Sequence, residues 1–293
     1  MATTYRHRHG DRKEGRLLRS LPAFNKFIPY IMPERNDRFV HYEEAMEISA
    51  VDRRLRALRV EGYKGIGLLH FFIACHVRAI SMLPGMNRFV VGRRIYARKN
   101  IEVVMTVKRE LTIDATETTI KVVFEPTDTI FDVYRKLNAK IEEIKTSDEN
   151  NGTEDFAETI AKLPRGLLRF AIGILRMMDY FGWIPQAWLD VSPFHGSMII
   201  TDLGSLRIGP VYHHIYNFGT LPVFLAFGTK RHAYELDRNG NILERKYVDA
   251  KAVVDEGIVD GHYYAQFFQA YRYMFQHPEI LESPPTKVVE DIF

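Results

Sequence analysis

Helical and strand-like segments alternate along most of this chain, and no other feature of the sequence restricts its fold as strongly. From 64 to 83, apolar residues recur at spacings of three and four until Pro84 and Gly85 end the pattern, which predicts a largely buried helix. Asp128 and Thr129 lie where the N-cap of a second predicted helix belongs. Strand-like segments lie around these helices at 38–49, 88–98, 101–111 and 118–124. The alternation predicts an α/β fold.

The second half of the chain continues the same alternation, so we predict a single domain from 38 to 293. The polar run TSDENNGT near 146–153 is interpreted as a surface loop within it. Residues 154–188 are predicted to be helical, and Asn-Gly within 237–241 predicts a tight turn. The final predicted helix, 262–276, carries aromatic residues on one face, as core-facing helices do. Further strands are predicted at 196–203, at 221–228 and from the turn to Val254.

The composition excludes several classes of protein. Hydrophobic residues make up 46% and aromatic residues 12% of the chain, which suffices for a substantial core and excludes intrinsic disorder. The net charge of +3 is too small to indicate a nucleic-acid-binding protein. Cys75 is the only cysteine, so no intrachain disulfide can form. It lies in an apolar run, where we predict a buried hydrophobic side chain and not a nucleophile.

No segment is predicted to span a membrane. The chain contains no uncharged apolar run of about 20 residues and no signal-peptide core, so we expect a cytoplasmic protein. The nearest approach, 167–188, is interrupted by charged residues. We interpret it as an amphipathic helix packed on its own domain or on another subunit.

Basic residues concentrate ahead of the predicted domain. Residues 1–37 are interpreted as a basic arm followed by a segment that Pro22, Pro29 and Pro33 prevent from being one long helix. The basic run itself, 5–19, is predicted to be solvated, and contact with a polyanion or a membrane surface is the alternative.

Three motifs occur in an order that one enzyme family uses. The first is the helix ending near 83, with LPGMNRFVVGRRIYAR after it. The second is GSMIITDLG at 196–204, followed by LPVFLAFGTK at 221–230. The third is VDEGIVDG at 254–261, which leads into the final helix and the sequence His-Pro-Glu at its end. Over most of its length the chain therefore resembles the catalytic domain of the 2-oxoacid dehydrogenase (dihydrolipoamide) acyltransferases, in the chloramphenicol acetyltransferase-like superfamily.

This resemblance implies a two-layer sandwich in which helices cover a mixed β-sheet, the chloramphenicol acetyltransferase-like fold. It also implies a homotrimer with sites between subunits. The implied reaction is transfer of an acyl group between a coenzyme A thioester and a small-molecule acceptor, with coenzyme A or acyl-CoA as the cofactor. Because neither a lipoyl domain nor a subunit-binding segment precedes the domain in this sequence, we expect a free-standing protein without a lipoyl attachment.

Glu256 stands where the family carries its catalytic histidine, four residues before the Asp-Gly pair. That histidine takes the proton from the coenzyme A thiol, a task suited to a base with a pKa near 6.5. A carboxylate is weaker by about 3 kcal/mol unless burial raises its pKa. Three interpretations stay open: acyl transfer with Glu256 as the base, a different reaction on the same fold, or a catalytically inactive trimer that binds a ligand or serves as a scaffold.

The resemblance suggests three further site residues. Asp260 matches an aspartate that pairs with an arginine to hold the catalytic loop, and a helix cap is the alternative. Ser197 lies where the family places a hydroxyl that donates to the tetrahedral oxyanion. A serine bonded to strand backbone is the alternative for Ser197, and Thr201 is the substitute if the alignment slips. His195, two residues before Ser197, is included because side chains at this spacing point to the same face of a strand.

Overall fold

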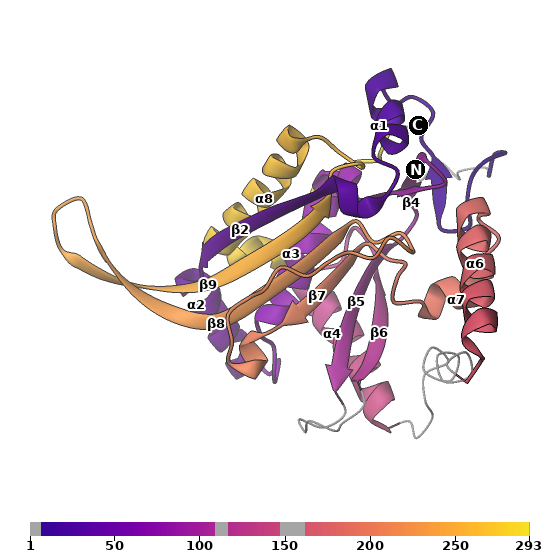
Figure 1. Cartoon of the computed structure of the whole chain (residues 1–293). Helices are drawn as coiled ribbons and strands as arrows, with labels where there is room; N and C mark the ends of the chain where they lie inside the picture. Colours follow the sequence, from indigo (N-terminus) through magenta and orange to yellow (C-terminus); the bar gives the residue numbers. More distant parts are fainter. Residues whose placement is uncertain (1–6, 109–116, 147–161, 293) are drawn as a thin grey trace.

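The structure is a computed structural model that describes residues 7–108, 117–146 and 162–292. Its main layer is a sheet built from β2 (Phe39–Glu47), β5 (Ile101–Lys108), β6 (Glu117–Phe124), β7 (Met198–Asp202), β8 (Val223–Leu236) and β9 (Ile242–Asp255). The six strands lie in the order β2-β9-β8-β7-β5-β6 (Figure 1). Strand β7 runs parallel to β5 and β8, whereas the other neighbours are antiparallel. The sheet is therefore mixed, as predicted.

Helices cover one face of this sheet and enclose the main core. They are α2 (Ser49–Val60), α3 (Leu68–Met82), α4 (Ile130–Thr146) and α8 (Gly261–Gln276). Met198 and Ile200 of β7 belong to the same buried cluster as Phe71 of α3 and Phe267 of α8. Because alternate residues of a strand point to opposite faces, Ile199 faces the other side, where it packs in a smaller cluster. The predicted two-layer α/β sandwich is confirmed.

Part of the N-terminal segment is packed into the domain and does not form a solvated arm. Strand β1 (Gly15–Leu17) pairs with β4 (Arg94–Arg98), and β4 pairs with β3 (Arg88–Val91), which makes a second, three-stranded sheet. Arg12 and Glu14 are buried and form an ion pair. The prediction of solvation is therefore wrong for Arg12 and Glu14, whose charges pair within the domain, whereas Lys13 and Arg19 are exposed. The proline-rich part forms a short helix, α1 (Ala23–Ile31), with Pro29 inside it.

Two helices lie beside the sheet and precede β7 in the chain (Figure 1). Of the stretch predicted to be helical, 154–161 lies outside the described residues. The remainder is divided into α6 (Arg165–Phe181) and α7 (Gln186–Val191), because Gly182 adopts a left-handed φ of 74° that ends α6. Asp179 is the single buried residue of α6. Within the described residues, no helix is both long and apolar enough to cross a membrane. The loop predicted near 146–153 lies, except for its first residue, outside the described residues.

Most of the other predicted elements are present. The Asn-Gly turn joins β8 to β9, with Gly240 at φ 82°, and Cys75 is fully buried. Helix α2 has no counterpart in the prediction. Short 3-10 turns occur at η1 (Arg35–Arg38), η2 (Pro84–Asn87), η3 (Gly204–Leu206) and η4 (Pro278–Glu282).

Candidate functional site

Glu256 lies in the turn that follows β9, and its side chain is exposed. Its backbone N–H donates to the carbonyl of Arg38 at 2.9 Å. The preceding residue, Asp255, is buried and accepts two hydrogen bonds from the Arg38 guanidinium, at 2.8 and 3.1 Å. Gly257 completes the arrangement, because a Cβ there would lie 2.5 Å from Arg38 Nε. The loop that presents Glu256 is thus held rigidly on both sides of that residue.

Asp260 caps a helix in this structure. Its side chain accepts from the Tyr263 amide at 2.9 Å, at the N-terminus of α8, and it is exposed. In the same loop it is Asp255 that pairs with arginine: it meets Arg38 and also lies 3.4 Å from Arg35 Nε. Of the two interpretations of Asp260, the helix cap is therefore the one observed within a single chain.

Ser197 is fully buried next to the start of β7. Its Oγ accepts from the Glu102 amide at 2.8 Å and donates to the Asn100 carbonyl at 3.4 Å. A hydroxyl engaged in this way does not face a space where an oxyanion would form, so the alternative of a serine bonded to strand backbone is observed. Thr201, four residues further along, is half-buried on the same face.

His195 lies in a different polar cluster from Glu256. It is 2% exposed, with Nδ1 2.7 Å from Ser192 Oγ and Nε2 3.4 Å from Asp179 Oδ1. Burial lowers the pKa of His195 below its ordinary value of 6.5, and the hydrogen bond to Asp179 offsets part of that shift. This lowered pKa favours the neutral ring, in which one ring nitrogen can accept a proton.

Asp179 joins this cluster from α6, far away in the sequence. Arg12 donates to Asp179 Oδ1 at 3.0 Å, and the Gly219 amide donates to Oδ2 at 3.2 Å. Burial acts to raise the pKa of Asp179, but the bond from His195 and the positive charge of Arg12 lower it overall. Sequence reasoning missed both Asp179 and Ser192. The available signals were a lone acid in the apolar run 167–188 and the sequence Ser-Pro-Phe-His.

An apolar cavity of about 450 Å³ adjoins Ser192 and His195. Its other walls are mainly hydrophobic and include Leu175, Ile184, Trp188, Phe194 and Phe218. A cavity of this size and character suits an apolar chain or ring.

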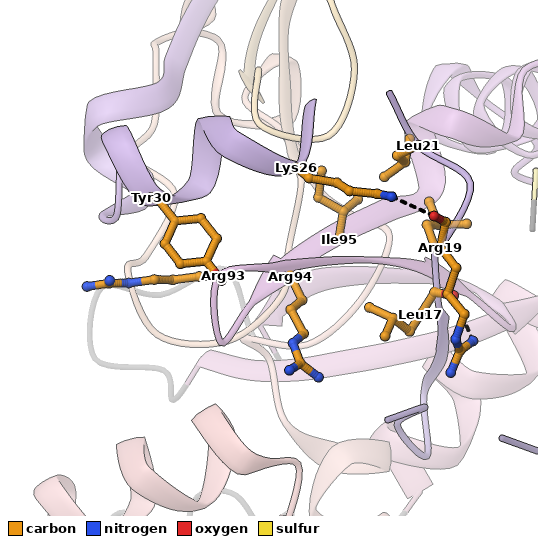
Figure 2. Close-up of a pocket in the computed structure, with 9 residues that line it drawn as sticks. Leu17, Arg19, Leu21, Lys26, Tyr30, Arg93, Arg94 and Ile95 are labelled. Carbon is orange, nitrogen blue, oxygen red and sulfur yellow. Dashed lines mark hydrogen bonds between the residues drawn. The ribbon is translucent and has the colours of Figure 1, made fainter. Parts of the chain in front are cut away.

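A second cavity, of about 310 Å³, lies between α1 and the β4 strand, and Figure 2 shows the side chains around it. Four of its lining residues are cationic: Arg19, Lys26, Arg93 and Arg94. Lys26 donates to the Arg19 carbonyl, and Arg19 pairs with Asp11. Arg93 lies over the ring of Tyr30. None of the predicted site residues lines this cavity.

Comparison with solved structures supports the fold described above. No protein-family model and no curated protein matches the sequence. A probable dihydrolipoamide acetyltransferase from Listeria monocytogenes superposes with a TM-score of 0.56 at 15% identity, covering 92% of this chain and 95% of that one. The Azotobacter vinelandii dihydrolipoamide acetyltransferase gives a TM-score of 0.53 at 13% identity, covering 90% of this chain and 93% of that one. A chloramphenicol acetyltransferase gives 0.53 at 12% identity, covering 86% and 94%.

These identities are too low to transfer an activity, because one fold supports many functions. They do cover nearly the whole of both chains in each pair, so the likeness extends over the complete domain. The chain has the fold of the 2-oxoacid dehydrogenase and chloramphenicol acetyltransferase-like catalytic domains.

Proposed function

We propose that this protein is an acyltransferase that uses coenzyme A thioesters and a small-molecule acceptor, with Glu256 as the proton acceptor. The single observation that carries the proposal is the rigid loop around Glu256. A general base must be held within hydrogen-bond reach of the proton it removes, and the buried Arg38–Asp255 pair supplies such a support. The fold, shared with enzymes that transfer acyl groups, supports the same assignment.

The proposal includes assembly as a homotrimer. Glu256 is exposed in the single chain, whereas a proton acceptor for a thiol works best where water is excluded. A neighbouring subunit over the Glu256 loop would provide this enclosure and the remaining walls of the site. Coenzyme A would then reach Glu256 along the contact between two subunits.

A second candidate is a catalytically inactive trimer that binds a ligand or acts as a scaffold. The observation that favours it is the bonding of the Ser197 hydroxyl. This hydroxyl forms hydrogen bonds with two backbone groups, so its hydrogen is not directed at an oxyanion. Loss of such a donor costs an acyltransferase about 10²- to 10³-fold in rate. Thr201 is the residue that would have to replace it.

Release of free thiol from acetyl-CoA, with and without candidate acceptors, separates the two candidates. Glu256→Gln should lower the rate by about 10²- to 10⁴-fold if Glu256 accepts the proton, and stability should change little. Glu142→Gln, an exposed carboxamide substitution on α4, is the matched control. Glu256→His should retain or increase the rate. Binding of coenzyme A in calorimetry, without thiol release by any variant, would favour the inactive trimer.

A further inference from the structure

The polar cluster around His195 contains the parts of a nucleophilic site. Ser192 Oγ accepts from the Phe194 amide at 3.3 Å, which leaves its own hydrogen available to His195 Nδ1 at 2.7 Å. A carboxylate can only accept, so the ring hydrogen of His195 lies on Nε2 and faces Asp179. Nδ1 is then the free acceptor, next to a hydroxyl. Serine hydrolases use the same sequence of roles, with the two ring nitrogens exchanged.

We propose that Ser192 and His195 form a second catalytic centre, positioned by Asp179, in which Ser192 is transiently acylated by an ester or thioester with an apolar acyl chain. The cavity beside these two residues accepts the chain. Its walls are apolar apart from the Ser192 hydroxyl and the His195 imidazole. The reactive carbonyl is therefore the part of the substrate that contacts these two groups. The Glu256 loop takes no part in this chemistry, and the inference is independent of the function proposed for it.

Ser192, His195, the substrate and water supply every atom and proton that this reaction needs. Ser192 Oγ attacks the carbonyl carbon, and its proton moves to His195 Nδ1. The bond from that carbon to the leaving sulfur or oxygen breaks, and the leaving group takes the proton from His195. Water then attacks the acyl-serine and gives a proton to Nδ1. The bond from the acyl carbon to Ser192 Oγ breaks, Nδ1 returns the proton to Oγ, and a carboxylic acid is released. An acceptor hydroxyl or thiol in place of water gives transfer instead of hydrolysis.

Asp179 has a positioning role in this scheme. Arg12 and the Gly219 amide hold its carboxylate, so the carboxylate in turn fixes the tautomer and the direction of the imidazole. The charged groups that face the ring are Asp179 and, at longer range, Lys121 and Glu14.

Fluorophosphonate labelling followed by peptide mass spectrometry tests the nucleophile directly. Wild-type protein should carry the adduct on Ser192, and Ser192→Ala should lose it. His195→Gln should slow labelling by about 10²- to 10⁴-fold. Ser205→Ala is the matched control, because Ser205 lies on an exposed turn and its Oγ donates to the Asp202 carbonyl. Thermal unfolding of each variant separates loss of reactivity from loss of the fold.

Hydrolysis of p-nitrophenyl esters tests the cavity. The rate should rise about fourfold for each CH₂ that the cavity buries, from the acetate towards the octanoate. Ala187→Trp, which places a larger side chain in the wall of the cavity, should remove this gain. The acidic limb of the pH–rate profile should lie below 6.5, because burial lowers the pKa of His195. Asp179→Asn should move that limb to lower pH, since the carboxylate favours the protonated ring.

Three outcomes would overturn the proposal. One is the absence of both a Ser192 adduct and ester turnover in folded wild-type protein. Another is labelling of Ser192 no faster than of Ser205. The third is labelling that His195→Gln leaves unchanged, which would mean that the hydroxyl is not activated by the ring. None of these results depends on coenzyme A or on Glu256, so failure here leaves the acyltransferase proposal standing, and the reverse also holds.

Discussion

Arg38 and Asp255 are almost fully buried, with side chains 2% and 1% exposed, and they meet in a two-point ion pair. Arg35 lies against the same carboxylate and also donates to the Gly219 carbonyl, while the Gly219 amide donates to Asp179. The support for the Glu256 loop and the support for His195 are therefore connected through one buried network. Charges buried in this way are tolerated only while each keeps its partner.

Removal of one partner from the Arg38–Asp255 pair should destabilise the fold strongly. We expect Arg38→Met to lower the free energy of unfolding by about 3 to 5 kcal/mol, because Asp255 would remain buried beside a single, more distant arginine. Urea unfolding followed by circular dichroism measures this. Arg231→Met is the matched control: its pair with Asp249 is exposed, so a loss of about 0 to 1 kcal/mol is expected. Equal losses for both variants would contradict a special role for the buried pair.

At the start of helix α8, Asp260 lies near Glu256 but stabilises the helix and takes no part in the proposed chemistry. One face of the helix packs into the core, where Phe267, Tyr271 and Phe275 are fully buried, as their helical spacing predicted. Its first turn depends on Asp260, whose carboxylate satisfies the Tyr263 amide. The position of Asp260 follows from where the helix begins, and this explains why it does not reach an arginine in the single chain.

If Asp260 acts as a cap, its charge matters less than its ability to accept a hydrogen bond. Asp260→Ala should therefore lower the free energy of unfolding by about 0.5 to 2 kcal/mol. Asp260→Asn should lower it much less, because the amide oxygen can still accept the hydrogen bond. Thiol release from acetyl-CoA should be similar in both variants and in wild-type protein. A large loss of activity in Asp260→Asn, with stability retained, would instead indicate that the charge pairs with an arginine in the assembled protein.

At the scale of the whole molecule, the β8–β9 hairpin reaches away from the body of the domain (Figure 1). Apolar side chains near its tip are open to solvent, with Tyr234, Leu236 and Ile242 between 72% and 73% exposed. Exposed apolar groups gathered on a projecting element are typical of a surface that another chain covers. This is consistent with the homotrimer proposed for the function.

We expect light scattering after size exclusion to give three times the mass of one chain. Leu236→Glu combined with Ile242→Glu should shift the protein to smaller species, because both charges would be buried in the contact. Val60→Glu is the matched control, since Val60 is 89% exposed at the end of α2 on a different element. A monomer mass for wild-type protein would contradict both the assembly and a Glu256 site enclosed by a neighbour.

The sequence by itself determined the elements whose residues follow a period. The apolar pattern predicted α3, alternation and turn chemistry predicted the hairpins, and the order of the motifs predicted the fold, because burial of one face imposes these patterns locally. It did not predict α2, whose buried Val51, Leu55 and Leu58 alternate with several charged residues. Nor did it show the division between α6 and α7, which depends on the backbone conformation of Gly182.

Only the tertiary structure decided which polar groups meet. Asp179 and His195 come from different elements, as do Arg38 and Asp255, and no spacing in the chain indicates either pair. The reason is physical: a buried charge requires a partner, but any element that packs nearby can supply it. Ser197 illustrates the same limit, because the sequence left two roles open for it and the backbone of Glu102 determined what its hydroxyl does.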